Sequence, residues 1–243
     1  MTKPAFVLIQ PQMGENIGAA ARAMLNFGLD HMRITAPRDG WPNPKAVAMA
    51  SGAGRVLDAA RIYDTTDAAL ADRTYTYATT ARIRDLTKPV LTPEAAMVDA
   101  ASRIANGEKV AVMFGPERAG LENADVARAN AIINVPVNPE FASLNLAQCV
   151  LLTGYEWQRA TANAPAQRTE MAGTDRATGE QVAALASHYE QALTKAGFWF
   201  PDHKEDSMKL NLRNFWSRMP MTHADVAMLF GIMRQMVRWK ERG

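Results

Sequence analysis

Strand-like and helix-like segments alternate along the first 160 residues, and this alternation constrains the fold more than any other feature of the chain. The strand-like runs are short and apolar, and helical segments follow them. We expect strands at residues 6–9, 32–35, 62–63, 75–79, 109–114 and 131–135, and helices at residues 17–27, 44–60, 67–70, 93–106, 123–129 and 143–157. This order predicts an α/β domain whose mostly parallel sheet has helices on both faces.

The rest of the chain lacks strand-like runs. Residues 161–179 are rich in Ala, Thr, Gly and Arg without sustained periodicity, which is typical of a linker. Three further helices are predicted at residues 180–197, 207–218 and 222–240. We therefore expect an α/β domain at residues 1–160, a linker at 161–179 and an α-helical C-terminal extension at 180–243.

Composition excludes several classes of protein. The 27 basic and 25 acidic side chains give a net charge of +2, which excludes a polybasic binder but allows a local basic patch. The single cysteine, Cys149, excludes an intrachain disulfide and a cysteine-based zinc site, and the four scattered histidines predict no metal site. No apolar stretch approaches the roughly 18 residues of a membrane span. We expect a cytoplasmic protein without a membrane partner.

Polar, Gly-rich or Pro-rich segments follow four of the expected strands, at residues 10–18, 79–84, 115–121 and 137–145. In parallel sheets, ligands bind at the carboxyl ends of the strands. These segments therefore predict a rim around one small polar ligand. The P-loop and the G-x-G-x-x-G fingerprint are both absent, which disfavours a nucleotide-using enzyme such as a dehydrogenase.

Three segments resemble the motifs of one family, in the family's order. They are Asn-Ile-Gly-Ala-Ala-Ala-Arg-Ala-Met at residues 16–24, Phe-Gly-Pro-Glu-Arg-Ala-Gly-Leu at 114–121 and Val-Pro-Val-Asn-Pro-Glu-Phe-Ala-Ser-Leu-Asn-Leu-Ala at 135–147. Together they resemble the SpoU (TrmH-like) branch of the SPOUT RNA methyltransferases. Residues 78–82 and 138–147 look like those enzymes of the branch that methylate a ribose 2′-hydroxyl in the tRNA anticodon loop. The resemblance covers about residues 4–160, and the helical tail is only loosely similar.

The resemblance implies a fold and a cofactor. The fold would carry a C-terminal trefoil knot, whereas periodicity alone predicts an ordinary doubly wound sheet, because knots are rare. The cofactor would be S-adenosylmethionine, held by Thr79, Thr80, Ala81, Gly115, Val135, Ala142, Ser143 and Leu144. Glycine at 115 allows a ligand to approach the backbone closely. Turn geometry explains Gly115 almost as well, and an N-cap role for the helix at 143–157 explains Ser143.

The resemblance also implies catalytic residues, with Arg22 first. A permanently charged guanidinium can bind the phosphate beside the target ribose or stabilise the forming alkoxide, and no metal is required. Asn16 could hold the ribose or orient Arg22, Glu117 could pair with an arginine or accept a substrate hydrogen bond, and Asn145 could support the methyl-transfer site. For Arg22 the alternative is an exposed arginine on a helix, and for Asn16 it is an N-cap before Ile17. For Glu117 the alternative is an acid near a helix N-terminus, and for Asn145 it is a structural hydrogen bond.

RNA contacts are expected from Arg82, Arg84 and Lys88, which only Asp85 opposes in this stretch. A solvated surface is the alternative for each of them. The resemblance implies a homodimer that modifies tRNA, not DNA, at anticodon-loop position 32 on cytidine or uridine. Other readings are a non-catalytic RNA-binding module of the same fold and another rRNA or tRNA 2′-O-methyltransferase.

Overall fold

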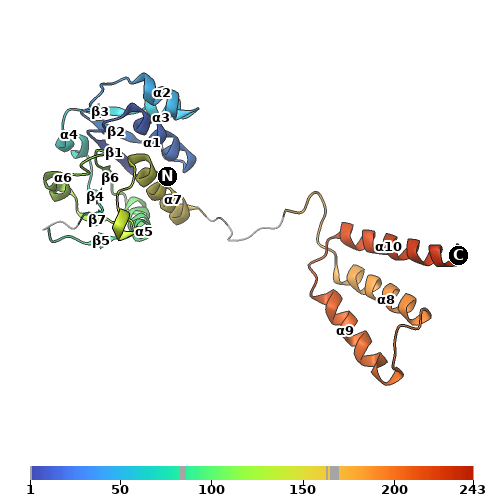
Figure 1. The fold of residues 1–243 in the computed structure, drawn as a ribbon. Coiled ribbons are helices and arrows are strands. Elements are labelled where there is room, and N and C mark those ends of the chain that lie inside the picture. Colours follow the sequence, from blue (N-terminus) through green and yellow to red (C-terminus); the bar gives the residue numbers. More distant parts are fainter. Residues whose placement is uncertain (1, 83–85, 163, 165–169, 243) are drawn as a thin grey trace. The chain divides into compact units, whose positions relative to one another are not determined.

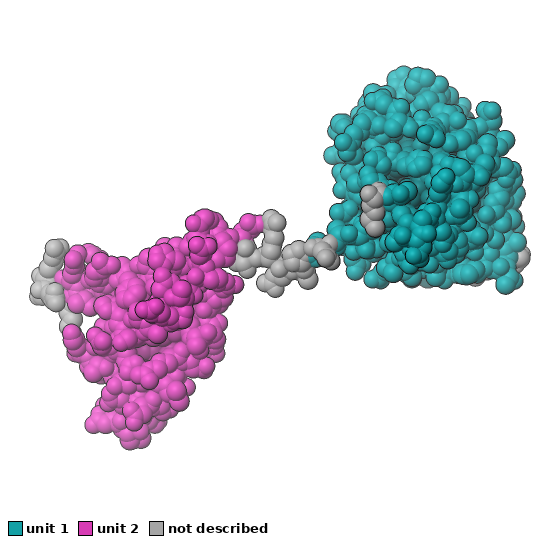
Figure 2. Space-filling view, turned by 180° about the vertical axis from the view of Figure 1, so that it is seen from behind, with its two compact units in different colours: residues 1–164 teal, residues 165–243 magenta. Residues whose placement is uncertain are grey.

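A computed structural model describes residues 2–82, 86–162, 164 and 170–242, without the side chains of residues 240–242. The chain divides into two compact units, residues 1–164 and 165–243 (Figure 2). Each unit has a hydrophobic core of its own. Among the described residues, no helix combines the length and the apolar character needed to cross a membrane.

Strands and helices alternate through the first unit. In chain order, its elements are β1 (Ala5–Ile9), α1 (Gly14–Asn26), β2 (Met32–Thr35), α2 (Pro44–Ala50), α3 (Gly54–Asp58), β3 (Arg61–Tyr63), α4 (Thr66–Leu70), β4 (Tyr75–Thr79), β5 (Val90–Leu91), α5 (Pro93–Ala105), β6 (Val110–Phe114), α6 (Asn123–Arg128), β7 (Ala131–Ile133), the 3-10 turn η1 (Pro139–Phe141) and α7 (Leu146–Thr161). The helix expected at residues 44–60 is two helices, because Ser51 and Gly52 adopt left-handed backbone angles between them. The short strand β5 was not predicted.

The strands of this unit form one sheet in the order β3-β2-β1-β6-β4-β7-β5. Every strand pair in it is parallel. The expected parallel α/β sheet is thereby confirmed, but its strand order is not that of an ordinary doubly wound sheet. The late strands β6 and β7 lie between strands that precede them in the chain, with β6 between β1 and β4 and β7 between β4 and β5.

Helices cover both faces of the sheet, as Figure 1 shows. Alternate residues of β1 point to opposite faces, as in any strand. Phe6 and Leu8 belong to the larger core, which α1, α2, α3, α5 and α7 complete. Val7 and Ile9 belong to the second core, beneath α4 and α6. Since β1 is buried on both faces, it reads in the sequence as a continuous apolar run.

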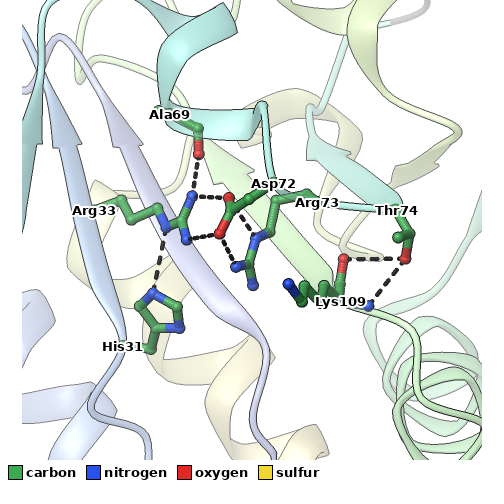
Figure 3. A network of polar contacts seen from close by, with 7 residues as sticks. All are labelled: His31, Arg33, Ala69, Asp72, Arg73, Thr74 and Lys109. Atoms are coloured by element: carbon green, nitrogen blue, oxygen red, sulfur yellow. Dashed lines mark hydrogen bonds and ion pairs between the residues drawn. The ribbon is translucent and has the colours of Figure 1, made fainter.

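A charged cluster lies at the edge of the sheet where the strands begin (Figure 3). Arg33 on β2 is 1% exposed, and its guanidinium donates to both carboxylate oxygens of Asp72, at 2.6 and 2.9 Å, and to the carbonyl of Ala69. Arg73 donates to the same carboxylate. The hydrogen bonds from Arg33 and Arg73 hold the pKa of Asp72 well below its usual range. One carboxylate thus neutralises two largely buried guanidinium groups.

The second unit is a helical assembly of α8 (Gly179–Lys195), α9 (Glu205–Ser217) and α10 (His223–Arg242), with the 3-10 turn η2 (Asp202–Lys204) before α9. Its small core contains Leu185, Trp216 and Val226. The predicted helical C-terminal region is confirmed. A groove of about 1030 Å³ is lined by residues of α8 and α9 and by residues 219–221.

Replacing the shared carboxylate should destabilise the first unit. We expect Asp72→Asn to lower the free energy of unfolding by about 2–3 kcal/mol, because two guanidinium groups would lose their counter-charge. Asp64→Asn is the control, since Asp64 is exposed and has no side-chain hydrogen bond or ion pair among the described residues. Urea unfolding of both variants checks this. Equal stability of the two variants would contradict the structural role of Asp72.

Protonation of His31 should make this unit sensitive to acid. Its ring accepts a hydrogen bond from Nε of Arg33 at 3.3 Å, and burial, together with the charges of Arg33 and Arg73, lowers the pKa of His31 to about 4. The unfolded chain binds this proton near pH 6.5, so stability should fall as the pH drops from about 6.5 to about 4.

A variant that cannot titrate tests the effect of His31. We expect His31→Gln, which keeps a hydrogen-bond acceptor, to reduce the loss of stability across this pH window by about 1–2 kcal/mol. Urea unfolding at several pH values measures the loss for both proteins. Parallel stability curves for the variant and the wild type would show that His31 is not the titrating group.

Candidate active site

Three polar segments meet around one cavity at the carboxyl edge of the sheet. They follow β4, β6 and β7, which are neighbours in the sheet, and the cavity has a volume of about 260 Å³. All eight residues predicted to hold a cofactor line it: Thr79, Thr80, Ala81, Gly115, Val135, Ala142, Ser143 and Leu144. Phe114, Ile133 and Val137 add apolar walls. The fourth segment, which follows β1, does not line the cavity.

Hydrogen bonds between these segments fix the cavity wall. Thr80 donates its backbone N–H to the carbonyl of Ile133 at 3.1 Å, and the amide of Asn134 donates back to the carbonyl of Thr80 at 2.9 Å. The hydroxyl of Thr79 donates to the carbonyl of Met113 at 2.9 Å. The ends of β4, β6 and β7 are therefore held in a fixed arrangement around the cavity.

The loop at residues 115–121 approaches itself so closely that only glycine fits at its start. A Cβ atom on Gly115 would lie 2.2 Å from the backbone nitrogen of Leu121 and 2.4 Å from the carbonyl carbon of Gly120. The N–H of Gly120 donates to the carbonyl of Pro116 at 2.8 Å, and Gly120 has a φ of +66°. The geometry of this turn thus explains why residue 115 is glycine. The backbone of Gly115, which carries no side chain, borders the cavity and remains available to a ligand.

Cys149 on α7 also lines the cavity, which was not predicted. Burial raises the pKa of its thiol to about 11, so the group is neutral at physiological pH. The only available signal was its position in the helix that follows the third motif. A neutral thiol adds a small, weakly polar surface to the wall.

Glu117 joins the segments after β1 and β6. Its carboxylate accepts hydrogen bonds from the backbone N–H groups of Gln12 at 2.8 Å and Met13 at 3.2 Å, and from the side-chain amide of Asn16 at 2.8 Å. Asn145, which follows β7, donates its side-chain amide to the side-chain oxygen Oδ1 of Asn16 at 3.0 Å. Three of the four predicted catalytic residues therefore form one hydrogen-bonded chain beside the cavity.

Two expected helix caps are wrong. Asn145, not Ser143, caps α7: its side chain accepts from the N–H of Ala147, and the side chain of Gln148 accepts from the N–H of Asn145. Asn16 does not cap α1, because that helix already begins at Gly14. Glu117 does lie beside the N-terminus of α1, where a negative charge is favourable, although it comes from another segment.

Arg22 stands apart from this chain of residues. It is exposed on α1, does not line the cavity, and has no hydrogen bond or ion pair among the described residues. Asn16 does not hydrogen-bond to it, since the amide of Asn16 is bonded to Glu117 and Asn145. The guanidinium is therefore available to a group from outside the described chain.

The predicted RNA-contacting residues differ in their positions. Arg82 is exposed and lines the cavity. The ammonium group of Lys88 donates to the carbonyls of Ala127 and Ala129 at the end of α6, so it already has local partners. Arg84 lies outside the described residues. Among the described residues, no cluster of three or more His, Cys, Asp or Glu side chains is suited to a metal ion.

Comparison with family models decides the family of the chain. Residues 3–155 match the SpoU rRNA Methylase family. The chain belongs to this SpoU family. Residues 180–243 match a second model, that of the tRNA methyltransferase TrmJ, C-terminal domain. The tail that looked only loosely similar in sequence therefore matches a described domain along its whole length.

Individual SpoU-family relatives cover nearly the whole chain. The tRNA (cytidine/uridine/adenosine-2′-O-)-methyltransferase TrmJ of Pseudomonas aeruginosa is 35% identical over 238 residues, which cover 94% of this chain and 91% of the relative. The tRNA (cytidine/uridine-2′-O-)-methyltransferase TrmJ of Yersinia pestis is 34% identical, with 94% and 89% covered. The crystal structure of TrmJ from Z. mobilis ZM4 has a TM-score of 0.84 at 46% identity and covers 97% of this chain and 99% of its own.

Enlarging Gly115 should damage the cavity without unfolding the protein. We expect Gly115→Ala to weaken binding of S-adenosylhomocysteine, the demethylated form of the expected cofactor, by at least about tenfold, because the added methyl forces the loop apart. Gly54→Ala is the control, since a Cβ atom there meets nothing within 4 Å. Calorimetry measures both affinities. If the two variants bound S-adenosylhomocysteine equally well, the loop at residues 115–121 would not be part of the ligand site.

Proposed function

We propose that this SpoU-family chain is an S-adenosylmethionine-dependent methyltransferase that acts on a ribose 2′-hydroxyl of tRNA. The observation that carries the proposal is the cavity beside the Glu117–Asn16–Asn145 chain, because all three family motifs meet there. The TrmJ relatives, named as tRNA 2′-O-methyltransferases, support the substrate. Cytidine and uridine stand in the names of both relatives, and the resemblance favours anticodon-loop position 32.

The cavity residues fit this cofactor. A volume of about 260 Å³ lies just below the roughly 300–1000 Å³ range of small-molecule sites. Val135, Ile133 and Leu144 provide apolar walls for an adenine ring, and Thr79 and Ser143 provide hydroxyl groups. When bound, the cofactor supplies a methyl group on a positively charged sulfonium.

The residues beside the cavity would bind and orient the sugar. Methyl transfer replaces the hydroxyl hydrogen of the ribose, so a proton leaves and negative charge builds up on the sugar oxygen. Arg22, always cationic, can stabilise that oxygen or hold the neighbouring phosphate. Asn145 donates one amide hydrogen to Asn16 and keeps a second for the sugar. Glu117 holds Asn16 in position for this contact.

We also propose that the enzyme is a homodimer with its site near the subunit interface, as the family resemblance implies. Arg22 fits this arrangement, because its guanidinium lies outside the cavity of its own chain and has no partner among the described residues. The single cysteine fits the cytoplasmic location that we expect. A C-terminal trefoil knot stays a prediction from the resemblance.

Removal of the Arg22 charge tests the proposed reaction. We expect Arg22→Gln to lower kcat for methyl transfer to tRNA at least about 100-fold, because charge on the sugar oxygen loses its stabilising cation. Affinity for S-adenosylhomocysteine should stay within about twofold, since Arg22 does not line the cavity. Mass spectrometry of tRNA nucleosides measures the product and its base.

Arg55→Gln serves as the matched control, because Arg55 is exposed on α3 and has no described partner. If Arg22→Gln kept full methyl-transfer activity, Arg22 would have no role in the mechanism. A wild-type protein that binds tRNA and S-adenosylhomocysteine but transfers no methyl group would instead be a non-catalytic RNA-binding module.

A further inference from the structure

The tip of the loop after β6 carries one long side chain. The loop is fixed at both ends, by the close contact of Gly115 with Leu121 and by the bond between Gly120 and Pro116. Glu117 is tied to the segment after β1. Only residues 118 and 119 of this loop are exposed, and residue 119 is alanine. Arg118 is therefore a long cationic side chain at the tip of a loop that is held at both ends.

Arg118 has no partner of its own in the described part of the chain. It takes part in no hydrogen bond, ion pair or ring contact there, unlike Arg33, Arg128 and Arg159, which all pair with carboxylates. Nevertheless it lines the cavity. A guanidinium that is exposed and also borders a ligand cavity lies at its mouth.

The adjacent carboxylate leaves the charge of Arg118 available. Among the described residues that line the cavity, Glu117 is the only acidic one, and its two oxygens accept hydrogen bonds from Gln12, Met13 and Asn16. Its carboxylate is thus directed toward the segment after β1. With Arg82 and Arg118 against this one carboxylate, the described lining residues carry a net charge of +1 (two minus one), which favours an anion.

We propose that Arg118 binds a backbone phosphate of the RNA and so positions the target ribose over the cavity. A planar guanidinium matches the two free oxygens of a phosphodiester. Its exposed place on the loop tip favours a polyanion that arrives from solvent over a cofactor that would bind among the buried lining residues. This inference rests on the proposed function and adds a positioning residue to it.

The test compares Arg118→Gln with Arg118→Lys in the full-length protein. For Arg118→Gln we expect the KM for tRNA to rise about tenfold while kcat stays within about twofold. The slope of log(kcat/KM) against log[salt] should become shallower by about 0.7–0.9, the loss of one phosphate contact. Arg118→Lys, which keeps the charge, should restore most of the affinity at low salt.

The matched control is Arg61→Gln, which removes an equally exposed charge from the start of β3, at the opposite edge of the sheet. Affinity for S-adenosylhomocysteine and the melting temperature are measured for every variant. Equal KM and salt slope in Arg118→Gln and Arg61→Gln would overturn the proposal. A tenfold loss of S-adenosylhomocysteine affinity in Arg118→Gln would overturn it too, because Arg118 would then serve the cofactor's carboxylate.

Filter binding of tRNA keeps this test independent of catalysis. If the wild-type protein transferred no methyl group, the proposed function would fail, yet tRNA affinity would still report on Arg118. We expect Arg118→Gln to bind tRNA about tenfold more weakly than Arg61→Gln in the presence of S-adenosylhomocysteine. Equal tRNA affinities would overturn the phosphate contact even if methylation by the wild type were normal.

Discussion

The candidate site depends on the hydrogen bonds that the carboxylate of Glu117 accepts. This carboxylate ties the loop after β6 to the start of α1, and through Asn16 it reaches Asn145 after β7. These three segments are far apart in the sequence, and each follows a different strand. In the part of the chain that the structure describes, this anion accepts hydrogen bonds only from neutral N–H groups, so no arginine or lysine side chain there is hydrogen-bonded to it. The chemistry proposed here needs such unused cations.

The two edges of the sheet use charge in opposite ways. At the edge where strands begin, Arg33 and Arg73 both donate to Asp72, so these charges are paired with one another within the fold. At the edge where strands end, Arg118 is exposed and without a partner among the described residues, and Arg22, exposed on α1, has no partner there either. The net charge of +2 does not show this difference in charge pairing between the two edges of the sheet. The distribution of pairing, rather than the total charge, distinguishes the edge suited to a polyanion.

Local sequence signals predicted much of the fold and of the cavity. The strand expected at residues 75–79 is β4, because aromatic and β-branched residues there are continuous and buried. The eight expected cofactor residues came from the family resemblance, and they line one cavity because the segments that carry them follow strands that end at one edge. The resemblance supplied their role, and the parallel sheet explains why they meet.

Signals that depend on tertiary contacts were misread. Ser143 and Asn145 are both good N-caps, and only the bond to Gln148 shows which of them begins α7. Lys88 reads as a free cation in the sequence, but the fold places it against the carbonyls at the end of α6. Arg118 was not singled out inside its motif, because its lack of a partner among the described residues can be seen only in the fold.

The strand order explains why the alternation of strands and helices along the sequence could not by itself locate the site. An ordinary doubly wound sheet holds its ligand where the strand order reverses, beside its first strand. Here β6 enters between β1 and β4, and β7 enters between β4 and β5, so late segments of the chain return to the middle of the sheet. The cavity lies over these inserted strands. The first motif therefore does not line the cavity and is joined to it through the hydrogen bond from Asn16 to Glu117, whereas residues of the second and third motifs form the wall. This division of roles follows from topology rather than from residue type.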